Sequence, residues 1–372
     1  MSWDEAVAQI MTATSDAGQY RAPRDLVSGT PHTKLAATSK DVINFASNDY
    51  LGLSQHPTLR RAAIAAIERN GTGSGSARLI VGSRPTHSQL ERRLAQWRCA
   101  DAATLFSTGY TANLGAISTF GRHASAVLSD ELNHASIIDG CRLSQGQTIV
   151  YRHRDLSDLD SKLAGAGPQA LVVTDTVFSM DGDVAPIHDL AAICARHQAL
   201  LILDDAHMVF DEDLTGELDC PTLRVGTLSK TVGCIGGYVC GPAAYIDVLV
   251  NKARPYIFTT AGTPAATAAA IAAIDILEGC EGKQLKATLR SNIDQVRPGH
   301  PSPIIPIILG NEDRSVAVSS ELQKMGILVP AIRPPTVAPG TSRLRLTVSA
   351  AHTPGDMRRL LSALDAAGVD AT

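Results

Sequence analysis

The chain has 372 residues, of which 44% are hydrophobic and 19% charged, and its formal net charge is −4. A chain of this length can bury a large core and is expected to form two domains in one subunit. It has no long run of one charge sign, which argues against a protein that binds nucleic acid or a membrane surface. Its seven cysteines are scattered and never form a C-x-x-C pair. They predict reduced thiols in a cytoplasmic protein and no metal site.

The first part of the chain, residues 1–52, is expected to hold a helix at about 3–19, an irregular polar connector and a short strand from Val42. Met1–Glu5 show neither the basic region nor the apolar region of a signal peptide. The alanine-rich stretch Ala261–Leu277 is short and interrupted by polar residues, which favours a buried helix over a membrane span. Two more helices are predicted at 57–69 and 86–97, on either side of the glycine–serine loop Asn70–Gly82.

Residues 53–279 are expected to form a large domain, because strand and helix patterns alternate between 103 and 241. This alternation is typical of an α/β fold with a mainly parallel seven-stranded sheet between helices. The predicted strands are Ala103–Ser107, Ala126–Ser129, Thr148–Tyr151, Ala170–Thr174, Leu200–Leu203, Leu223–Leu228 and Gly237–Cys240. The predicted helices are 110–119, 134–143, 157–163, 187–197 and 242–252.

Residues 280–372 have a different pattern and are expected to form a smaller α+β domain. Arg333–Thr336, with two prolines, is expected to be a rigid connection within it. The predicted strands are 303–309, 327–332 and 343–349, and the predicted helices are 313–325 and 354–367.

Lys230 is the first candidate for chemistry, because it lies in the glycine-rich segment Val225–Tyr238 without a neighbouring acid. A turn that carries a solvated lysine would explain this segment equally well. Upstream, however, a buried strand ends in Asp204 and Asp205, and ligands of open α/β sheets bind at the carboxyl ends of the strands. A lysine that forms a Schiff base and an aspartate that protonates a pyridine nitrogen are the groups that pyridoxal phosphate needs. Asp205 is the alternative to Asp204 for this role.

Other candidates follow the same strands. Gly109 lies where a strand passes into a helix, a junction that binds anions, and with Thr227 it predicts a phosphate site. His134 begins a helix and is expected to stack on a cofactor ring, although it could equally be a capping residue. Ser179 and His207 are expected near the ring hydroxyl. Arg345, in a strand of the second domain, is expected to hold a substrate carboxylate or to form an internal ion pair.

These motifs resemble those of the α-oxoamine synthases, pyridoxal-phosphate enzymes of fold type I. The resemblance runs from Asn44–Leu53 to Ser349–Thr353 and includes Asn133–Gly140, Val177–Asp183, Asp204–His207 and Thr227–Lys230. Ala331–Val337 is most similar to the branch of the family that uses alanine and a pimeloyl thioester.

The resemblance implies a role for each matching residue. Lys230 would carry the cofactor and move the α-proton of the amino acid, Asp204 would pair with the pyridine nitrogen, and His134 would stack on the ring. The other cofactor contacts would be Gly109, Tyr110, Ser179, His207 and Thr227, with Thr259 or Thr260 reaching the phosphate across a homodimer interface. The substrate contacts would be Arg21, Asn48, His134, Thr336 and Arg345.

The resemblance also implies the reaction: an amino acid condenses with an acyl thioester, carried by coenzyme A or a carrier protein, and carbon dioxide is lost. A second possibility keeps the fold and the cofactor but uses another acyl donor or amino acid. A third is a non-catalytic homologue, against which the presence of Lys230, Asp204 and His134 argues. The chain departs from the family pattern in loops expected near the acyl-thioester entrance, at Met208, Phe210–Leu223, Ser76–Ala77 and Gly262–Thr263.

Overall fold

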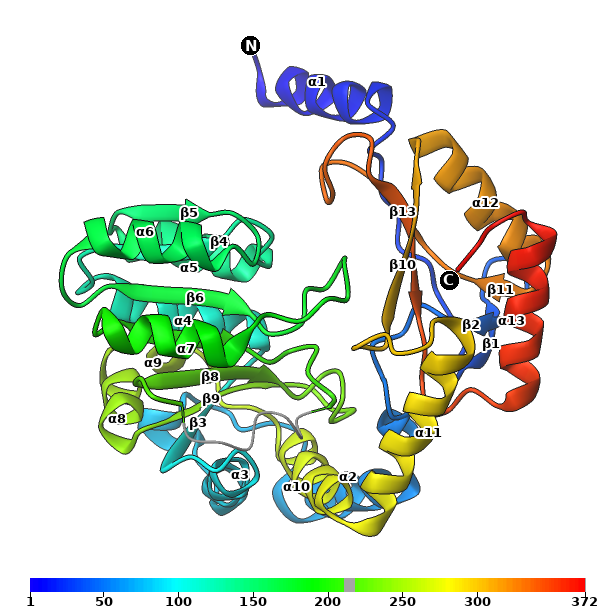
Figure 1. Cartoon of the computed structure of the whole chain (residues 1–372). Coiled ribbons are helices and arrows are strands. Elements are labelled where there is room, and N and C mark those ends of the chain that lie inside the picture. Colours follow the sequence, from blue (N-terminus) through cyan, green and yellow to red (C-terminus); the bar gives the residue numbers. More distant parts are fainter. Residues whose placement is uncertain (211–217, 372) are drawn as a thin grey trace.

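The computed structural model describes residues 1–210 and 218–371, and a seven-stranded sheet forms the centre of its larger part (Figure 1). The strand order is β3-β9-β8-β7-β6-β4-β5. The strands β5, β4, β6, β7 and β8 are parallel, and β9 is antiparallel to both of its neighbours. Their bounds are β3 Ala102–Phe106, β4 Val127–Asp130, β5 Thr148–Tyr151, β6 Leu171–Asp175, β7 Leu200–Asp204, β8 Thr222–Thr227 and β9 Gly237–Gly241. The predicted fold class, a mainly parallel seven-stranded sheet between helices, is confirmed.

Helices cover both faces of this sheet because its central strands are apolar on both sides. In β6, Leu171 and Val173 pack against one set of helices, whereas Val172 packs against the other. This follows from the period of two in a strand, which sends successive side chains to opposite faces. The helices on the first face are α4 Gly109–Gly121, α5 Ala135–Ser144, α8 Ala243–Lys252 and α9 Arg254–Ile257; those on the second are α6 Leu156–Ala166 and α7 Ile187–Arg196.

The sheet brings the candidate residues to one edge. Parallel strands end at the same side, so Asp130, Asp175, Asp204 and Thr227 all lie at the carboxyl edge. The antiparallel β9 starts at this edge, where Gly237 pairs with both Phe106 and Thr227. The hairpin that joins β8 to β9 therefore holds Lys230 beside the start of α4.

A second part of the molecule contains two three-stranded sheets and lies beside the first (Figure 1). One is antiparallel, in the order β10 Ile304–Gly310, β13 Ser342–Thr347 and β12 Ala331–Ile332; the other has the order β1 His32–Leu35, β2 Lys40–Asn44 and β11 Ile327–Leu328. The helices α11 Cys280–Val296, α12 Glu312–Lys324 and α13 Pro354–Ala366 accompany these sheets. The remaining elements are α1 Trp3–Asp16, α2 Pro57–Asn70, α3 Pro85–Trp97, α10 Pro264–Glu278 and the short turns η1 Leu53–Gln55 and η2 Arg78–Gly82.

Three local predictions were wrong or incomplete. The connector expected to be irregular contains β1, which pairs with β2. The single strand expected at 327–332 is two short strands in different sheets, separated by Val329 and Pro330; a proline has no N–H to continue a ladder. The helix α11 was not predicted. The boundaries proposed for the domains remain a prediction.

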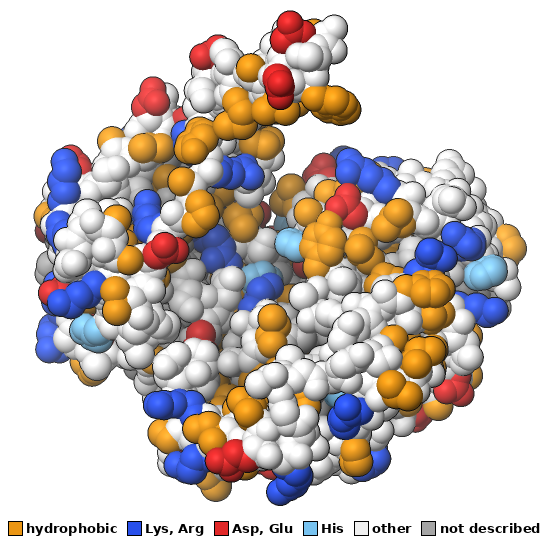
Figure 2. All heavy atoms as spheres, turned by 180° about the vertical axis from the view of Figure 1, so that it is seen from behind, with side chains coloured by type: hydrophobic (Ala, Val, Ile, Leu, Met, Phe, Trp, Pro, Cys, Tyr) orange, Lys and Arg blue, Asp and Glu red, His pale blue; other side chains and the backbone are white. Residues whose placement is uncertain are grey.

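The helix α1 projects from the body of the molecule and buries none of its residues (Figure 1). The face of the molecule opposite to that of Figure 1 is hollowed between the two parts, and basic side chains and a histidine lie at the floor of the hollow (Figure 2). Within the described ranges, no helix combines the length and the apolar character that crossing a lipid bilayer requires.

Candidate active site

Lys230 lies in a polar chain that starts in the N-terminal part of the protein. Its amine is 2.8 Å from Nε2 of His207, and Nδ1 of His207 is 2.5 Å from the hydroxyl of Tyr50. The Tyr50 hydroxyl donates a hydrogen bond to Oδ1 of Asn48, at 3.2 Å. Because that hydroxyl has only one proton, its oxygen must accept from Nδ1–H of His207. Nε2 of His207 is then an acceptor, and it accepts from the amine of Lys230.

The protein environment favours the uncharged forms of this pair. Burial lowers the pKa of Lys230, although the carboxylates of Asp204 and Asp175 oppose the shift. Burial also holds the pKa of His207 well below its usual range, and the positive charges of Lys230 and Arg345 act in the same direction. A neutral imidazole beside a lysine with a lowered pKa suits an amine that must take up and release a proton near neutral pH.

Asp204 and Asp205 are consecutive but face different partners. Asp204 is only 4% exposed; its Oδ2 accepts from Asn113 at 2.6 Å and its Oδ1 from the N–H of Ala206 at 2.9 Å. Burial raises the pKa of Asp204, and Lys230 lowers it. Asp205 instead forms an ion pair with Arg224, at 2.7 Å. Of the two candidates for the ring nitrogen, the geometry favours Asp204.

His134 caps the start of α5 and keeps more than a third of its surface exposed. Its backbone N–H donates to Oδ2 of Asp175 at 2.7 Å, and its Nδ1 is 2.8 Å from the hydroxyl of Ser136. Protein packed around the imidazole lowers its pKa, whereas the charge of Asp204 raises it. Its free surface leaves room for the planar ring that the sequence led us to expect.

The start of α4 forms a corner with the hairpin of Lys230. A Cβ added to Gly109 would lie 3.0 Å from Cβ of Thr227, so any other residue would crowd Thr227 here. The backbone N–H groups of Gly109 and Tyr110 belong to the first turn, which has no acceptors within the helix. They donate to no protein acceptor in residues 1–210 and 218–371. With the hydroxyls of Thr227 and Ser229, 2.7 Å apart, they suit a phosphate.

Three of the residues predicted to contact the phosphate have other neighbours as well. The hydroxyl of Tyr110 donates to Asp139, which leaves its backbone N–H for an anion. The hydroxyl of Thr259 lies 3.4 Å from that of Ser107 in the same chain, and Thr260 pairs with Ala77. A contact from Thr259 or Thr260 across a dimer interface remains a prediction.

Arg345 is 6% exposed and comes from the second part of the molecule. Its Nε donates to the carbonyl of Ser179 at 2.6 Å, its Nη2 to Oδ1 of Asn48 at 3.1 Å, and its Nη1 to the hydroxyl of Thr347 at 3.1 Å. None of the carboxylates in the described ranges pairs with it, so the internal ion pair considered from the sequence is not found there. A buried guanidinium without a counter-charge is a natural partner for the carboxylate of a substrate.

Arg21 and Thr336 are not brought into this cluster, because both are exposed and have no side-chain contact with it. Met208 is buried, at 5% exposure. Part of the departure over Phe210–Leu223 lies outside the described residues, in 211–217.

Three further residues support the site and were not singled out from the sequence: Asn113, Tyr50 and Asp175. Asp175 is buried at the end of β6 beside Asp204, and burial together with the Asp204 carboxylate raises its pKa. The signal was present, because Asp175 ends an apolar strand in the same way as Asp204. Asn113 is a polar residue on an apolar helix, four residues after Gly109, and that spacing places both on one face.

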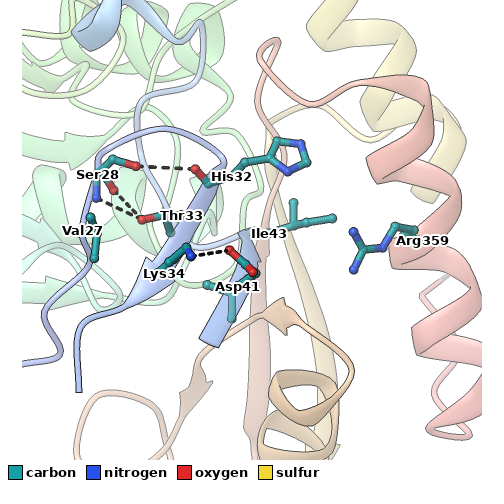
Figure 3. A pocket seen from close by; sticks show the side chains of 9 residues that line it. Val27, Ser28, His32, Thr33, Lys34, Asp41, Ile43 and Arg359 are labelled. Carbon is teal, nitrogen blue, oxygen red and sulfur yellow. Dashed lines mark hydrogen bonds and ion pairs between the residues drawn. The ribbon is translucent and has the colours of Figure 1, made fainter. Parts of the chain in front are cut away.

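A separate cavity of about 330 Å³ lies between β1, β2 and α13 (Figure 3). Its charged residues include Lys34 and Asp41, which are 3.7 Å apart, and its hydroxyls bond within the loop that contains Ser28. It is not part of the cluster around Lys230. In the part of the chain that the structure describes, no three His, Cys, Asp or Glu side chains are grouped to hold a metal.

The fold and the cluster define a pyridoxal-phosphate enzyme of fold type I: an amine at a glycine-rich hairpin, a buried carboxylate for the ring nitrogen and a corner for the phosphate. The family pattern "Aminotransferase class I and II" matches residues 40–364, and the chain belongs to this family.

Relatives of the chain narrow this class. It is 39% identical to 8-amino-7-oxononanoate synthase 2 of Bacillus subtilis (strain 168), over 99% of this chain and 98% of the relative. A solved structure of SPT (serine palmitoyltransferase) with a PLP internal aldimine has a TM-score of 0.89 and 30% identity, over 98% and 97% of the two chains. The structure of 8-amino-7-oxononanoate synthase from Francisella tularensis has a TM-score of 0.75 and 28% identity, over 88% and 96%.

Within the family, the protein is an α-oxoamine synthase, an acyltransferase whose cofactor is pyridoxal phosphate. The residues described above fit this cofactor: among the described residues no cation forms an ion pair with Asp204, a Cβ on Gly109 would crowd Thr227, and the charges of Lys230 and Asp204 act on each other.

Proposed function

We propose that the protein is an 8-amino-7-oxononanoate synthase of biotin biosynthesis. It would convert L-alanine and a pimeloyl thioester to 8-amino-7-oxononanoate, carbon dioxide and the free thiol. The proposal is supported by the 39% identity to the Bacillus subtilis relative over almost the whole chain. The observation that carries it is that the charges of Asp204, from the large sheet, and Arg345, from the second part of the molecule, both act on the amine of Lys230.

Each side chain has a defined task in this proposal. Asp204, held by Asn113, would bind the pyridine nitrogen, and His134 would cover one face of the ring. When bound, the cofactor withdraws electrons from the α-carbon of the amino acid. Gly109, Tyr110 and Thr227 would hold the phosphate.

Lys230 would move the proton at the α-carbon of alanine. The neutral His207 accepts a hydrogen bond from the amine of Lys230. Burial lowers the pKa of Lys230, so that its uncharged amine is accessible. Arg345 would bind the alanine carboxylate, because its fork is anchored by Ser179 and Asn48 and its charge has no other partner in the described residues. Placing substrate and base together in this way lowers the entropic cost of the reaction.

The proposal is tested with purified protein, pyridoxal phosphate, L-alanine and pimeloyl-coenzyme A. Mass spectrometry should detect 8-amino-7-oxononanoate, with one thiol and one carbon dioxide released per product. Pimeloyl carrier protein should be tested in parallel. Lys230→Ala serves as the inactive control. Product from other pairs of substrates but none from alanine and a pimeloyl thioester would overturn the proposal.

A second candidate is an α-oxoamine synthase with a different donor or amino acid, such as a glycine C-acetyltransferase or a secondary-metabolite aminoketone synthase. The TM-score of 0.89 to SPT favours keeping serine and palmitoyl-coenzyme A in the panel as well. Turnover with one of these pairs, and none with alanine and pimeloyl thioesters, would select it.

We also propose that the protein acts as a cytoplasmic homodimer with shared active sites. Ile80, Val81, Ile235 and Phe258 are each more than 60% exposed, and Phe258 precedes the two threonines expected at the interface. Association would remove such apolar surface from water. Light scattering coupled to gel filtration should give twice the mass of 39.1 kDa.

A further inference from the structure

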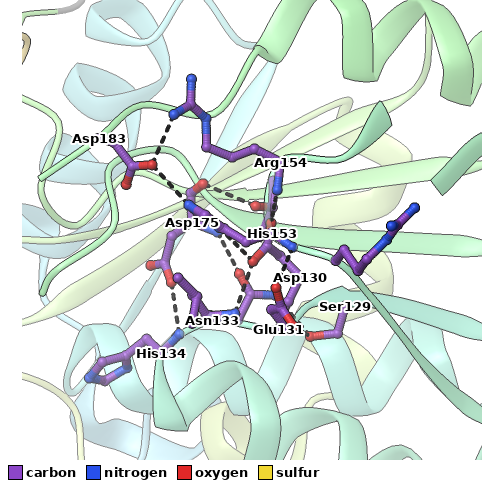
Figure 4. A network of polar contacts seen from close by, with 12 residues as sticks. Ser129, Asp130, Glu131, Asn133, His134, His153, Arg154, Asp175 and Asp183 are labelled. Carbon is purple, nitrogen blue, oxygen red and sulfur yellow. Dashed lines mark hydrogen bonds and ion pairs between the residues drawn. The ribbon is translucent and has the colours of Figure 1, made fainter. Parts of the chain in front are cut away.

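His153 lies between two carboxylates at the carboxyl edge of the large sheet (Figure 4). Its Nδ1 is 3.0 Å from Oδ1 of Asp130, and its Nε2 is 2.8 Å from Oδ2 of Asp183. Ionised carboxylates only accept hydrogen bonds, so both ring nitrogens must donate and the ring is an imidazolium. Burial opposes this charge, but the bonds to Asp130 and Asp183 prevail and raise the pKa of His153 to about 9.

The first carboxylate shapes the turn that leads to His134. Oδ1 of Asp130 accepts from the N–H of Leu132 and Oδ2 from the N–H of Arg154, both at 2.9 Å. Two residues after Leu132, the N–H of His134 donates to Asp175. A shift of Asp130 would therefore move the turn Leu132–His134, and with it the imidazole of His134 that is expected to lie on the cofactor ring.

The second carboxylate closes the loop Val177–Val184. The ends of this loop pair with each other, and the N–H of Phe178 donates to the carbonyl of Asp183. The ring of His153 meets that of Phe178 edge-on, with centroids 4.3 Å apart. The next residue, Ser179, accepts the hydrogen bond from Nε of Arg345. The loop thus transmits the position of Asp183 to the arginine expected to bind the substrate carboxylate.

Asp183 has few alternatives to this bond. Its Oδ1 is buried and has no hydrogen-bond partner among the residues that the structure describes, so its contacts depend on Oδ2. The second cation on Oδ2, Arg154, is 3.0 Å away with 44% of its side chain exposed, whereas His153 is 19% exposed. The ring of His153 contacts both carboxylates, whereas Arg154 contacts Asp183 through its side chain and Asp130 only through its backbone N–H.

We propose that His153 is a positioning residue of the reaction: its imidazolium links the turn of His134 to the loop of Ser179 and so fixes the spacing between His134 and Arg345. This inference rests on the proposed function for the identity of the amino acid. It assigns to His153 no contact with substrate or cofactor.

The test compares His153→Gln and His153→Leu with the unaltered holoenzyme, well below the unfolding temperature. The dissociation constant and KM of L-alanine should rise about tenfold or more, with a smaller change in the dissociation constant of pyridoxal phosphate. Alanine binding is followed by the absorbance of the bound cofactor, without an acyl donor. The glutamine, which keeps one donor, should be the milder of the two replacements.

Two controls separate positioning from stability. Leu249→Ala in α8 creates a cavity in a core cluster that includes neither Phe178 nor the other residues of the loop Val177–Val184, and should lower the unfolding temperature without changing alanine affinity. His197→Gln removes a histidine at the end of α7 that is bonded to one carboxylate, Asp160 of α6, at 2.7 Å, and it should also leave alanine affinity unchanged.

The outcomes are distinct. If the His153 variants bind alanine as the controls do, the inference is wrong. Should they fail to fold, Asp183→Asn decides the matter: it is isosteric and retains an acceptor for His153, and unchanged alanine affinity in this variant overturns the inference. A wild-type protein that binds glycine or serine but not alanine contradicts the proposed function instead, and the same titrations with that amino acid still test His153.

Discussion

The amine of Lys230 lies 2.8 Å from Nε2 of His207, and Nδ1 of the same ring lies 2.5 Å from the hydroxyl of Tyr50. This chain of hydrogen bonds connects the hairpin after β8 to the segment after β2. It fixes the tautomer of His207 and the position of the Lys230 amine, on which the charge of Asp204 acts.

Replacement of Lys230 by alanine should abolish turnover, with a loss of at least about 10²–10⁴-fold, because the variant lacks the base that moves the α-proton. Borohydride reduction followed by mass spectrometry should show the cofactor attached to the wild type but not to the variant. Lys162→Ala is the control: Lys162 pairs with Asp158, 2.7 Å away on α6, and its loss should change neither result.

Asp204→Asn and Asp205→Asn should have different effects although the residues are neighbours. The first should lower kcat about 100-fold or more, because asparagine cannot stabilise the positive charge on the pyridine nitrogen. The second should mainly lower stability, by about 3 kcal/mol, because Arg224 would remain largely buried without its counter-charge. Steady-state kinetics and thermal unfolding of both variants measure the contrast; equal kcat values would contradict the assignment of Asp204.

Arg345→Gln should raise KM for the amino acid by about 10–100-fold, because a charge-assisted bond to a carboxylate contributes roughly 1.5–3 kcal/mol. Arg345→Lys should recover little, since an ammonium cannot reproduce the bonds of the guanidinium to both Ser179 and Asn48. The measurement is alanine binding through the cofactor absorbance. If Arg345→Gln binds alanine as tightly as the wild type does, Arg345 does not bind the alanine carboxylate.

Gly109→Ala should weaken cofactor binding by about tenfold, because the new Cβ would meet Cβ of Thr227 at 3.0 Å. Gly165→Ala is a matched control in the helix α6, where an added Cβ has no neighbour within 4 Å. It should leave cofactor binding unchanged and, as a helical substitution of glycine, stabilise the fold slightly. Fluorescence titration with pyridoxal phosphate compares the two.

The stability that His153 contributes should depend on pH. Its folded pKa of about 9 lies above the usual 6.5, so the contribution is full below about pH 6.5 and is lost as the pH rises through 9. The charged groups around the ring are Asp130, Asp183 and Arg154, with Glu131 on its backbone N–H. The difference in unfolding temperature between wild type and His153→Gln should therefore shrink between pH 7 and pH 10.

The sequence alone was sufficient to predict the large sheet, because its strands are short apolar runs that end at polar or glycine residues. The same pattern placed Asp204 and Lys230 at one edge. It did not reveal β1, whose four residues alternate between exposed and buried positions and include two basic side chains, or the position of Pro330 between two sheets. A four-residue edge strand with two charged or polar exposed side chains has too little apolar pattern to stand out, although its partner β2 is close in the sequence.

Site residues that directly follow a strand of the large sheet could be predicted from the sequence. Contacts between residues that are distant in the sequence could not. The bond between Arg345 and the carbonyl of Ser179 joins residues 166 positions apart, and no local pattern indicates a backbone acceptor. The role of Tyr50 was hidden for the same reason, since His207 is 157 residues away. Arg21 and Thr336, assigned by resemblance, lie on the surface and await a test with substrate.

The two glycines that precede and begin β9 have a practical consequence for altering this enzyme. A Cβ on Gly237 would lie 2.2 Å from the carbonyl oxygen of Thr108, and Gly236 has a φ of 138° that other residues rarely adopt. Libraries aimed at new substrates should therefore leave this hairpin untouched and draw their diversity from the solvent-facing positions near Arg21 and Thr336.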